Sequence, residues 1–97
     1  MRPVLHGDVV AAARALYALP GEERIEGLGR LLRAADWAEK FRRHHRRAHP
    51  YWGDGSLMAA ALAEDPPAEP SLSDPDYCAC MALVLRTLSQ QGVSVRN

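Results

Sequence analysis

The sequence predicts an all-α protein, a single compact domain of four helices. Apolar residues recur with the 3.6-residue period of an α-helix along most of the chain, and no stretch shows a convincing strand pattern. Prolines and glycines interrupt this period and divide the chain into four helical segments. A chain of 97 residues ordinarily forms one domain, so we expect residues 1–97 to fold together.

The first two helices are delimited by a capping residue and two prolines. Asp8 is a suitable N-cap for a helix over about residues 9–19, which Pro20 ends. The second helix begins directly afterwards and runs to about Ala48, because Pro50 cannot continue it. It is the longest of the four, and we expect it to be the spine of the domain. Its apolar stripe consists of Ile25, Leu28, Leu31, Leu32, Ala35, Ala38 and Phe41, continued by His45.

The third helix is short and follows a glycine-rich turn. Ser56, with Asp54 as the alternative, is placed to cap the segment SLMAAALAE. Because this segment is apolar on nearly every side, we expect it to be buried in the middle of the fold. Residues 64–72 follow as an acidic, proline-rich connection, and this composition predicts a stiff and exposed segment.

The fourth helix begins where Ser73 or Asp74 can cap it. Residues that step by four, three and four along the sequence give it one apolar face, and these are Tyr77, Met81, Val84 and Leu88. Gly92 is expected to end the helix, which leaves residues 93–97 as a frayed tail.

Composition and charge restrict the class of protein. Lys and Arg together number 12, as do Asp and Glu, so the net charge is zero, which argues against a dedicated polyanion-binding protein. No apolar run approaches the roughly 20 residues that span a membrane, and no signal-peptide core follows the N-terminus. The two cysteines are too few for a disulfide framework. We therefore expect a cytoplasmic protein with reduced thiols and no membrane association.

The stretch RRHHRRAHPYWGDGS, residues 42–56, holds three of the four histidines together with four arginines, an aspartate and a serine. Its arginines are candidate partner-binding residues, and they are Arg42, Arg43, Arg46 and Arg47. They suit a nucleic acid or an acidic protein surface, but they also complement the negative end of the helix dipole, and the acidic connection can pair with them. Trp37 lies on the shoulder of the apolar stripe; core packing is the favoured interpretation, and the residue is kept as a further partner-binding candidate.

A metal site would draw on His45, His49, Cys78 and Cys80. The two histidines are four residues apart, but Pro50 takes His49 out of the helix. The two cysteines lie about 200° apart on the fourth helix, so they do not form the usual pair of zinc ligands. We predict no metal and no cofactor, and we expect the cysteines to be small apolar residues of their helix.

Three residues of the same stretch have the chemistry of a hydrolase triad, namely His49, Asp54 and Ser56. They fall within eight residues on one turn, whereas a working triad gathers its members from separate elements around a pocket. A structural role explains each of them: Asp54 and Ser56 as turn and capping residues, and His49 as the residue that pins the turn. We therefore predict no catalytic residues.

Two segments, RAHPYWGDGSLMAAALA and DPDYC, resemble those of a family of short, uncharacterised bacterial proteins, a domain of unknown function. The resemblance implies a small stand-alone protein, in agreement with a single domain. It implies no activity, cofactor, partner or site residue.

These observations predict a small, non-enzymatic helical interaction or accessory protein with a protein partner or a second copy of itself. One alternative is a nucleic-acid-associated protein that uses the basic end of the second helix. Another is a metal or catalytic site around His45, His49, Asp54 and a cysteine.

Overall fold

The computed structural model describes the backbone of residues 1–96 and the side chains of residues 1–91. Within this part the elements are α1 (His6–Tyr17), a short 3-10 turn η1 (Gly21–Glu23), α2 (Arg24–His45), α3 (Leu57–Leu62) and α4 (Pro75–Arg96). Residues 1–96 contain no strand, and the pairing of His49 with Gly53 is an isolated bridge. The all-α class and the four predicted helices are confirmed.

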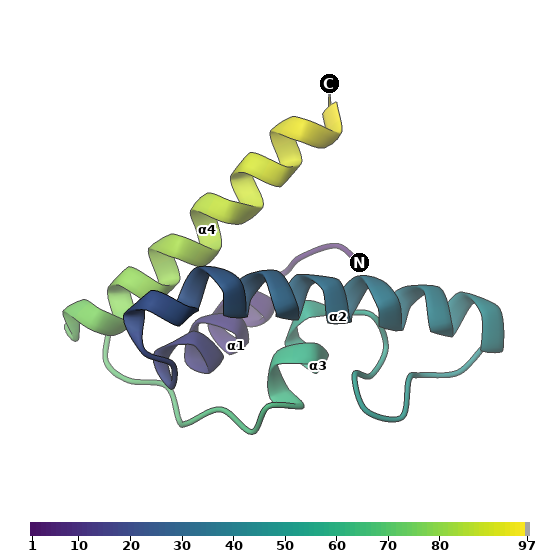
Figure 1. Ribbon diagram of the computed structural model, residues 1–97, viewed down its shortest axis with the longest axis horizontal. Helices are drawn as coiled ribbons and strands as arrows, with labels where there is room; N and C mark the ends of the chain where they lie inside the picture. Colours follow the sequence, from purple (N-terminus) through teal and green to yellow (C-terminus); the bar gives the residue numbers. More distant parts are fainter. Residues whose placement is uncertain (97) are drawn as a thin grey trace.

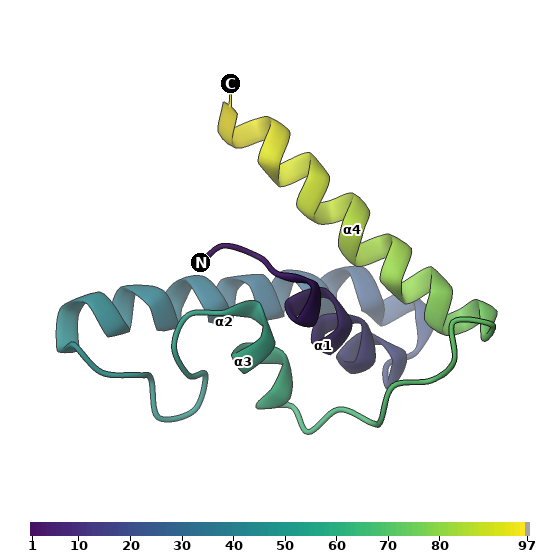
Figure 2. The ribbon, with the colours of Figure 1, turned by 180° about the vertical axis from the view of Figure 1, so that it is seen from behind.

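The long α2 spans the width of the molecule, as predicted, with α1 and α3 packed against it (Figure 1). The view from behind shows α1 at the centre, and α1 contacts all three other α-helices (Figure 2). It can do so because four of its buried residues are alanines, which allow the neighbouring helices to come close; they are Ala11, Ala12, Ala13 and Ala15. The C-terminal half of α4 extends away from the other helices in both views.

The start of α1 depends on Asp8, which is buried (5% exposed). Its Oδ2 accepts a hydrogen bond from the backbone N–H of Leu5 (2.7 Å). Its Oδ1 accepts one from the N–H of Met58 in the first turn of α3 (2.8 Å). The predicted N-cap at Asp8 is therefore wrong, because the helix begins at His6, before Asp8. Asp8 lies in the first turn of α1 and links the N-termini of α1 and α3.

The second helix is shorter than predicted and its buried face is narrower. It ends at His45, because Arg46 takes a left-handed conformation (φ 58°) and its N–H closes on the carbonyl of Arg42 (2.7 Å). Ile25 (76% exposed) and His45 are exposed, so their predicted places on the apolar stripe are wrong. Helical period fixes the direction in which a side chain points, but not whether a neighbouring element reaches it.

The predicted caps of the last two helices are confirmed. The Oγ of Ser56 accepts from the N–H of Ala59 (3.1 Å) at the start of α3. The Oδ1 of Asp74 accepts from the N–H of Tyr77 (3.3 Å) at the start of α4. Both helices bury one face, and α3 leaves Met58 and Leu62 partly exposed.

The helix α4 continues past Gly92, where we expected its end, to Arg96. The predicted frayed tail over 93–97 lies outside the residues whose side chains the structure describes. None of the helices within residues 1–96 combines the length and the hydropathy that crossing a membrane requires.

The proline-rich connection is mostly exposed, but three contacts tie it to the body. Glu64 binds Arg30, the carbonyl of Pro67 accepts from Arg14 Nε (2.8 Å), and Glu69 accepts from the hydroxyl of Tyr77 (2.8 Å). Two of its three carboxylates, those of Glu64 and Glu69, are therefore engaged away from the arginine cluster. Among the side chains described up to residue 91, no ion pair joins the connection to that cluster.

Candidate functional site

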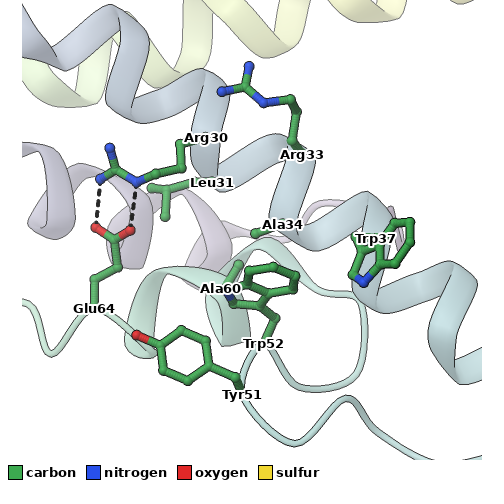
Figure 3. A pocket seen from close by; sticks show the side chains of 9 residues that line it. All are labelled: Arg30, Leu31, Arg33, Ala34, Trp37, Tyr51, Trp52, Ala60 and Glu64. Atoms are coloured by element: carbon green, nitrogen blue, oxygen red, sulfur yellow. Dashed lines mark hydrogen bonds and ion pairs between the residues drawn. The ribbon is translucent and has the colours of Figure 1, made fainter.

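An open groove of about 540 Å³ lies between α2, the turn that follows it and α3. Figure 3 shows the side chains around it, which come from these three elements and, for Glu64, from the start of the proline-rich connection. The lining residues are Arg30, Leu31, Arg33, Ala34, Trp37, Tyr51, Trp52, Ala60 and Glu64. We call this feature the aromatic groove, because three of its nine residues carry large aromatic rings.

The three rings differ in how firmly they are held. Trp52 is half-buried, with its indole stacked on the imidazole of His49 (4.8 Å between centroids, 17° between planes). Trp37 and Tyr51 lie on either side of it (Figure 3) and remain 59% and 62% exposed. The hydroxyl of Tyr51 donates to the carbonyl of Ala63 (3.2 Å), which fixes the direction of that ring. The groove therefore has one anchored indole and two accessible rings.

The turn that carries Tyr51 and Trp52 is held by hydrogen bonds from each of its backbone N–H groups between His49 and Gly53. His49 and Gly53 exchange two backbone hydrogen bonds (2.7 and 3.0 Å). The Nδ1 of His49 also accepts from the N–H groups of Tyr51 (3.1 Å) and Trp52 (3.0 Å). Gly53 has φ 81°, and a Cβ there would lie 2.6 Å from that of Ala59, so the turn requires glycine. The predicted structural role of His49 is confirmed.

Charged side chains close one end of the groove. Arg30 donates two hydrogen bonds of 3.0 Å to the carboxylate of Glu64, and these bonds hold the pKa of Arg30 above its ordinary value. The guanidinium of Arg33 is exposed, and it forms no ion pair among the side chains that the structure describes. One cation at the groove is thus neutralised and the other is open to a ligand.

A stripe of exposed side chains continues from the groove along α2. Arg33, Trp37, Lys40 and His44 follow at spacings of four, three and four, so they lie on one face of the helix. Trp37, Lys40 and His44 line a second hollow of about 220 Å³ together with Phe41 and His45. We call these four residues the α2 stripe. Trp37 lines both hollows, so it stands between them.

Core packing is the favoured expectation for Trp37, and its exposure shows that this expectation is wrong. The other residues of this surface are not among the predicted partner-binding residues. The spacing of Arg33, Trp37 and Lys40 was readable in the sequence and could have indicated a shared face. That Tyr51 and Trp52 lie beside them depends on the path of the turn, which residue spacing does not reveal.

The four arginines have different surroundings, and Arg42 is the one among them that is not exposed. Arg42 and Arg43 both reach Oε1 of Glu39, a buried carboxylate (4% exposed), and Arg43 does so through Nε at 3.3 Å. The hydrogen bond from Arg42 lowers the pKa of Glu39. Arg46 and Arg47 remain exposed, with the guanidinium of Arg47 6.0 Å from the centre of the Phe41 ring.

The residues considered for a triad have other partners. The Oδ1 of Asp54 accepts from the N–H of Ser56 (3.0 Å), a bond that lowers the pKa of Asp54, and its Oδ2 accepts from Arg2 (2.8 Å). The Oγ of Ser56 caps α3, and the Nδ1 of His49 accepts from the turn backbone. The arrangement serves the turn and the start of α3.

The structure separates the residues considered for a metal site. His45 and His49 both pack on the ring of Phe41. Cys80 is buried in the core around α1, where burial raises its pKa, and Cys78 is exposed. The start of α4, which carries both, lies at the opposite end of α2 from the histidines (Figure 1). Within the side chains described, no three of His, Cys, Asp or Glu are grouped to hold a metal ion.

Comparison with curated proteins and with solved structures gives no match. A family model described as "Domain of unknown function (DUF7742)" matches residues 2–88, which include every residue of the aromatic groove and of the α2 stripe. The expected resemblance to a domain of unknown function is confirmed, and the bacterial origin stays a prediction. Because the match covers most of its length, the chain belongs to the family Domain of unknown function (DUF7742).

Proposed function

We propose that this protein is a small, non-enzymatic interaction protein that binds a segment of a partner protein in the aromatic groove. The observation that carries this proposal is the exposure of Trp37 and Tyr51 on a rigid base. Exposed indole and phenol rings leave apolar surface in water, and burying them on a partner is favourable. Trp and Tyr are also the residues that most often dominate the energy of protein interfaces.

The polar groups of the groove support binding rather than catalysis. The carboxylate of Glu64 is held by Arg30, and the hydroxyl of Tyr51 is held by a backbone carbonyl. The lining contains no histidine, cysteine or serine that would act as a nucleophile or base. We further propose a cytoplasmic location, which is supported by the two free thiols and by the exposure of Cys78.

A nucleic-acid partner is the second candidate, because unpaired bases also stack on exposed aromatic rings next to cations. Arg33 and Lys40 beside Trp37 would suit it. The protein partner is favoured for two reasons. The net charge is zero, and Arg42 and Arg43 are directed to the chain's own Glu39.

The test places a photo-crosslinking amino acid at position 44 of the whole chain, on the α2 stripe beyond Trp37, so that the Trp37 ring is kept, and is done in cells of its source. The crosslinked partner is then purified, and its affinity is measured for the natural chain, for Trp37→Ala and for Ile25→Ala. Ile25 is a matched control, because it is an exposed apolar residue of the same helix. We expect Trp37→Ala to weaken binding about tenfold or more, as for an interface anchor, and Ile25→Ala to leave it unchanged. Equal affinity for all three would refute the proposal, and crosslinks to RNA or DNA would favour the second candidate.

A further inference from the structure

We infer that the aromatic groove and the hollow beside it hold one ligand, an extended acidic segment of the partner. Two carboxylates three residues apart contact Arg33 and Lys40, and an apolar residue or a proline between them packs on Trp37. This inference rests on the proposed function and adds the chemistry and the spacing of the ligand.

The spacing follows from helix geometry. Arg33 and Lys40 are seven residues apart on one face of α2, which corresponds to about 10 Å along the helix axis. An extended or polyproline-type chain advances about 3.1–3.4 Å per residue, so three residues cover the same length. Trp37 lies between the two cations, at the level of the residues between the two acids.

The negative charge of the ligand follows from which carboxylates of the chain already have partners. Arg33 and Lys40 form no ion pair among the described side chains. Glu64 is bound twice by Arg30, Glu39 is buried against Arg42, and Asp36 pairs with the amino group of Met1 (2.6 Å). The surface around Trp37 therefore carries positive charge that the chain itself does not neutralise, and a carboxylate ligand complements it.

The apolar part of the ligand follows from the floor and walls of the groove. Leu31, Ala34 and Ala60 form an apolar floor beside Trp52. Proline-rich segments bind in aromatic-lined grooves of this kind, because their extended conformation is already formed and loses little entropy on binding. From Arg30 to His44 the two hollows follow α2 for about 21 Å, which suits a segment of six or seven residues.

A single-stranded nucleic acid fits this surface less well than an acidic segment. Such a ligand is held by a positively charged groove that follows the backbone from one phosphate to the next. On the α2 stripe the two open cations are separated by an indole and an apolar floor. Two isolated charges with an apolar contact between them match side-chain carboxylates better than a row of phosphates.

The test is an NMR titration of the full chain with the peptide Ser-Glu-Ala-Pro-Glu-Ala-Ser, followed through the indole N–H signals of Trp37 and Trp52. A second peptide replaces both glutamates with glutamine, and a third replaces them with lysine. We expect the glutamate peptide to shift both indole signals and to bind about five- to tenfold more tightly than the glutamine peptide, as two partly exposed ion pairs allow. The lysine peptide should not bind.

Charge reversal separates recognition from folding. Arg33→Glu with Lys40→Glu should lose the glutamate peptide and bind the lysine peptide, whereas Arg86→Glu, an exposed cation on α4, should behave as the natural chain. Trp37→Ala should weaken binding of the glutamate and glutamine peptides, and Ile25→Ala should weaken neither.

Each contrary outcome overturns a stated part of the idea. Equal binding of the glutamate and glutamine peptides, both lost in Trp37→Ala, overturns the acidic ligand and leaves the proposed function standing. No binding of the glutamate peptide at up to about 1 mM overturns the inference. If a uridine oligonucleotide, or a second copy of this chain, instead shifts the indole of Trp37, the proposed function falls with it.

Discussion

At the scale of single residues, Asp8 decides how two helices meet. It is the buried carboxylate that receives one hydrogen bond from each of two helix starts, Leu5 before α1 and Met58 in α3. Negative charge at both helix N-termini is favourable, because the exposed N–H groups there carry partial positive charge. Asp8 and Met58 are 50 residues apart in the sequence, so the hydrogen bond between them fixes α3 against α1.

Replacing Asp8 with alanine should therefore destabilise the fold by about 2 kcal/mol, since two part-buried N–H groups lose their acceptor. Asp8→Asn retains one acceptor oxygen and should cost less. Urea unfolding followed by circular dichroism measures both variants. A loss below about 0.5 kcal/mol for Asp8→Ala would show that the two N–H groups find water or another acceptor.

Tyr77 is fully buried, and its hydroxyl donates to Glu69 on the proline-rich connection. Burial, followed by this hydrogen bond, raises the pKa of Tyr77 to about 12. The unfolded value is about 10, so the stabilisation is complete below about pH 10 and is lost as the pH rises towards 12.

We expect stability to fall between about pH 10 and pH 12, and Tyr77→Phe to reduce this fall. At pH 8 the variant should lose about 1 kcal/mol, the usual contribution of one hydrogen bond. Unfolding in urea at several alkaline pH values tests this. Tyr51→Phe is the control, because the ring of Tyr51 is exposed and its hydroxyl also makes one hydrogen bond. If Tyr77→Phe loses as much stability between about pH 10 and pH 12 as the natural chain does, the raised pKa of the Tyr77 hydroxyl is not the cause of that loss.

At the scale of elements, the end of α2 shows how local conformation determines a boundary. Arg46 adopts a left-handed conformation that glycine adopts without cost and that other residues adopt with a cost of about 1 kcal/mol. The helix stops there, before Pro50 can have any effect. Arg46 therefore ends α2 through its backbone conformation, and its guanidinium is not needed for this.

Arg46→Gly should raise the free energy of unfolding by about 0.5–1 kcal/mol, because it removes this strain. The matched control is Arg47→Gly, which changes the adjacent exposed arginine and relieves no positive φ. We expect the control to be neutral or slightly destabilising. A loss of stability in Arg46→Gly would instead indicate that its side chain has a structural contact.

At the scale of the whole molecule, the distribution of charge bears on how strongly the protein binds a nucleic acid. The chain is neutral overall, and two of the four clustered arginines bind Glu39. We expect weak binding to random duplex DNA, lost near about 150 mM salt, with a log–log slope no steeper than about −2 for two free arginines. A salt titration measures this. If sub-micromolar binding persists at that salt concentration and is lost when Arg46 and Arg47 are both replaced with glutamate, a nucleic acid is favoured over a protein as the partner.

The projecting half of α4 bears on the prediction of a homodimer. The alanine-rich face of α1 is buried inside the chain. A groove of about 510 Å³ between the N-terminal segment and α4 instead exposes apolar side chains, including Leu5 and Leu85. We expect a two-fold dimer at micromolar concentration by light scattering, and Leu85→Asp should give the mass of one chain while Ile25→Asp does not. A concentration-independent mass of one chain for the natural protein would contradict this.

The sequence by itself determined the all-α class, the number of helices and the caps at Ser56 and Asp74, because periodicity and capping act within a few residues of the chain. The tertiary structure decided which faces are covered. Ile25 and Trp37 have the spacing of buried residues, yet both are exposed, because no element reaches them. Conversely, Glu39 has the chemistry of a surface residue and is buried between α2 and the turn at Gly55. The aromatic groove arises in the same way, since the rings of α2 and of the turn meet only when the chain folds back beneath the helix.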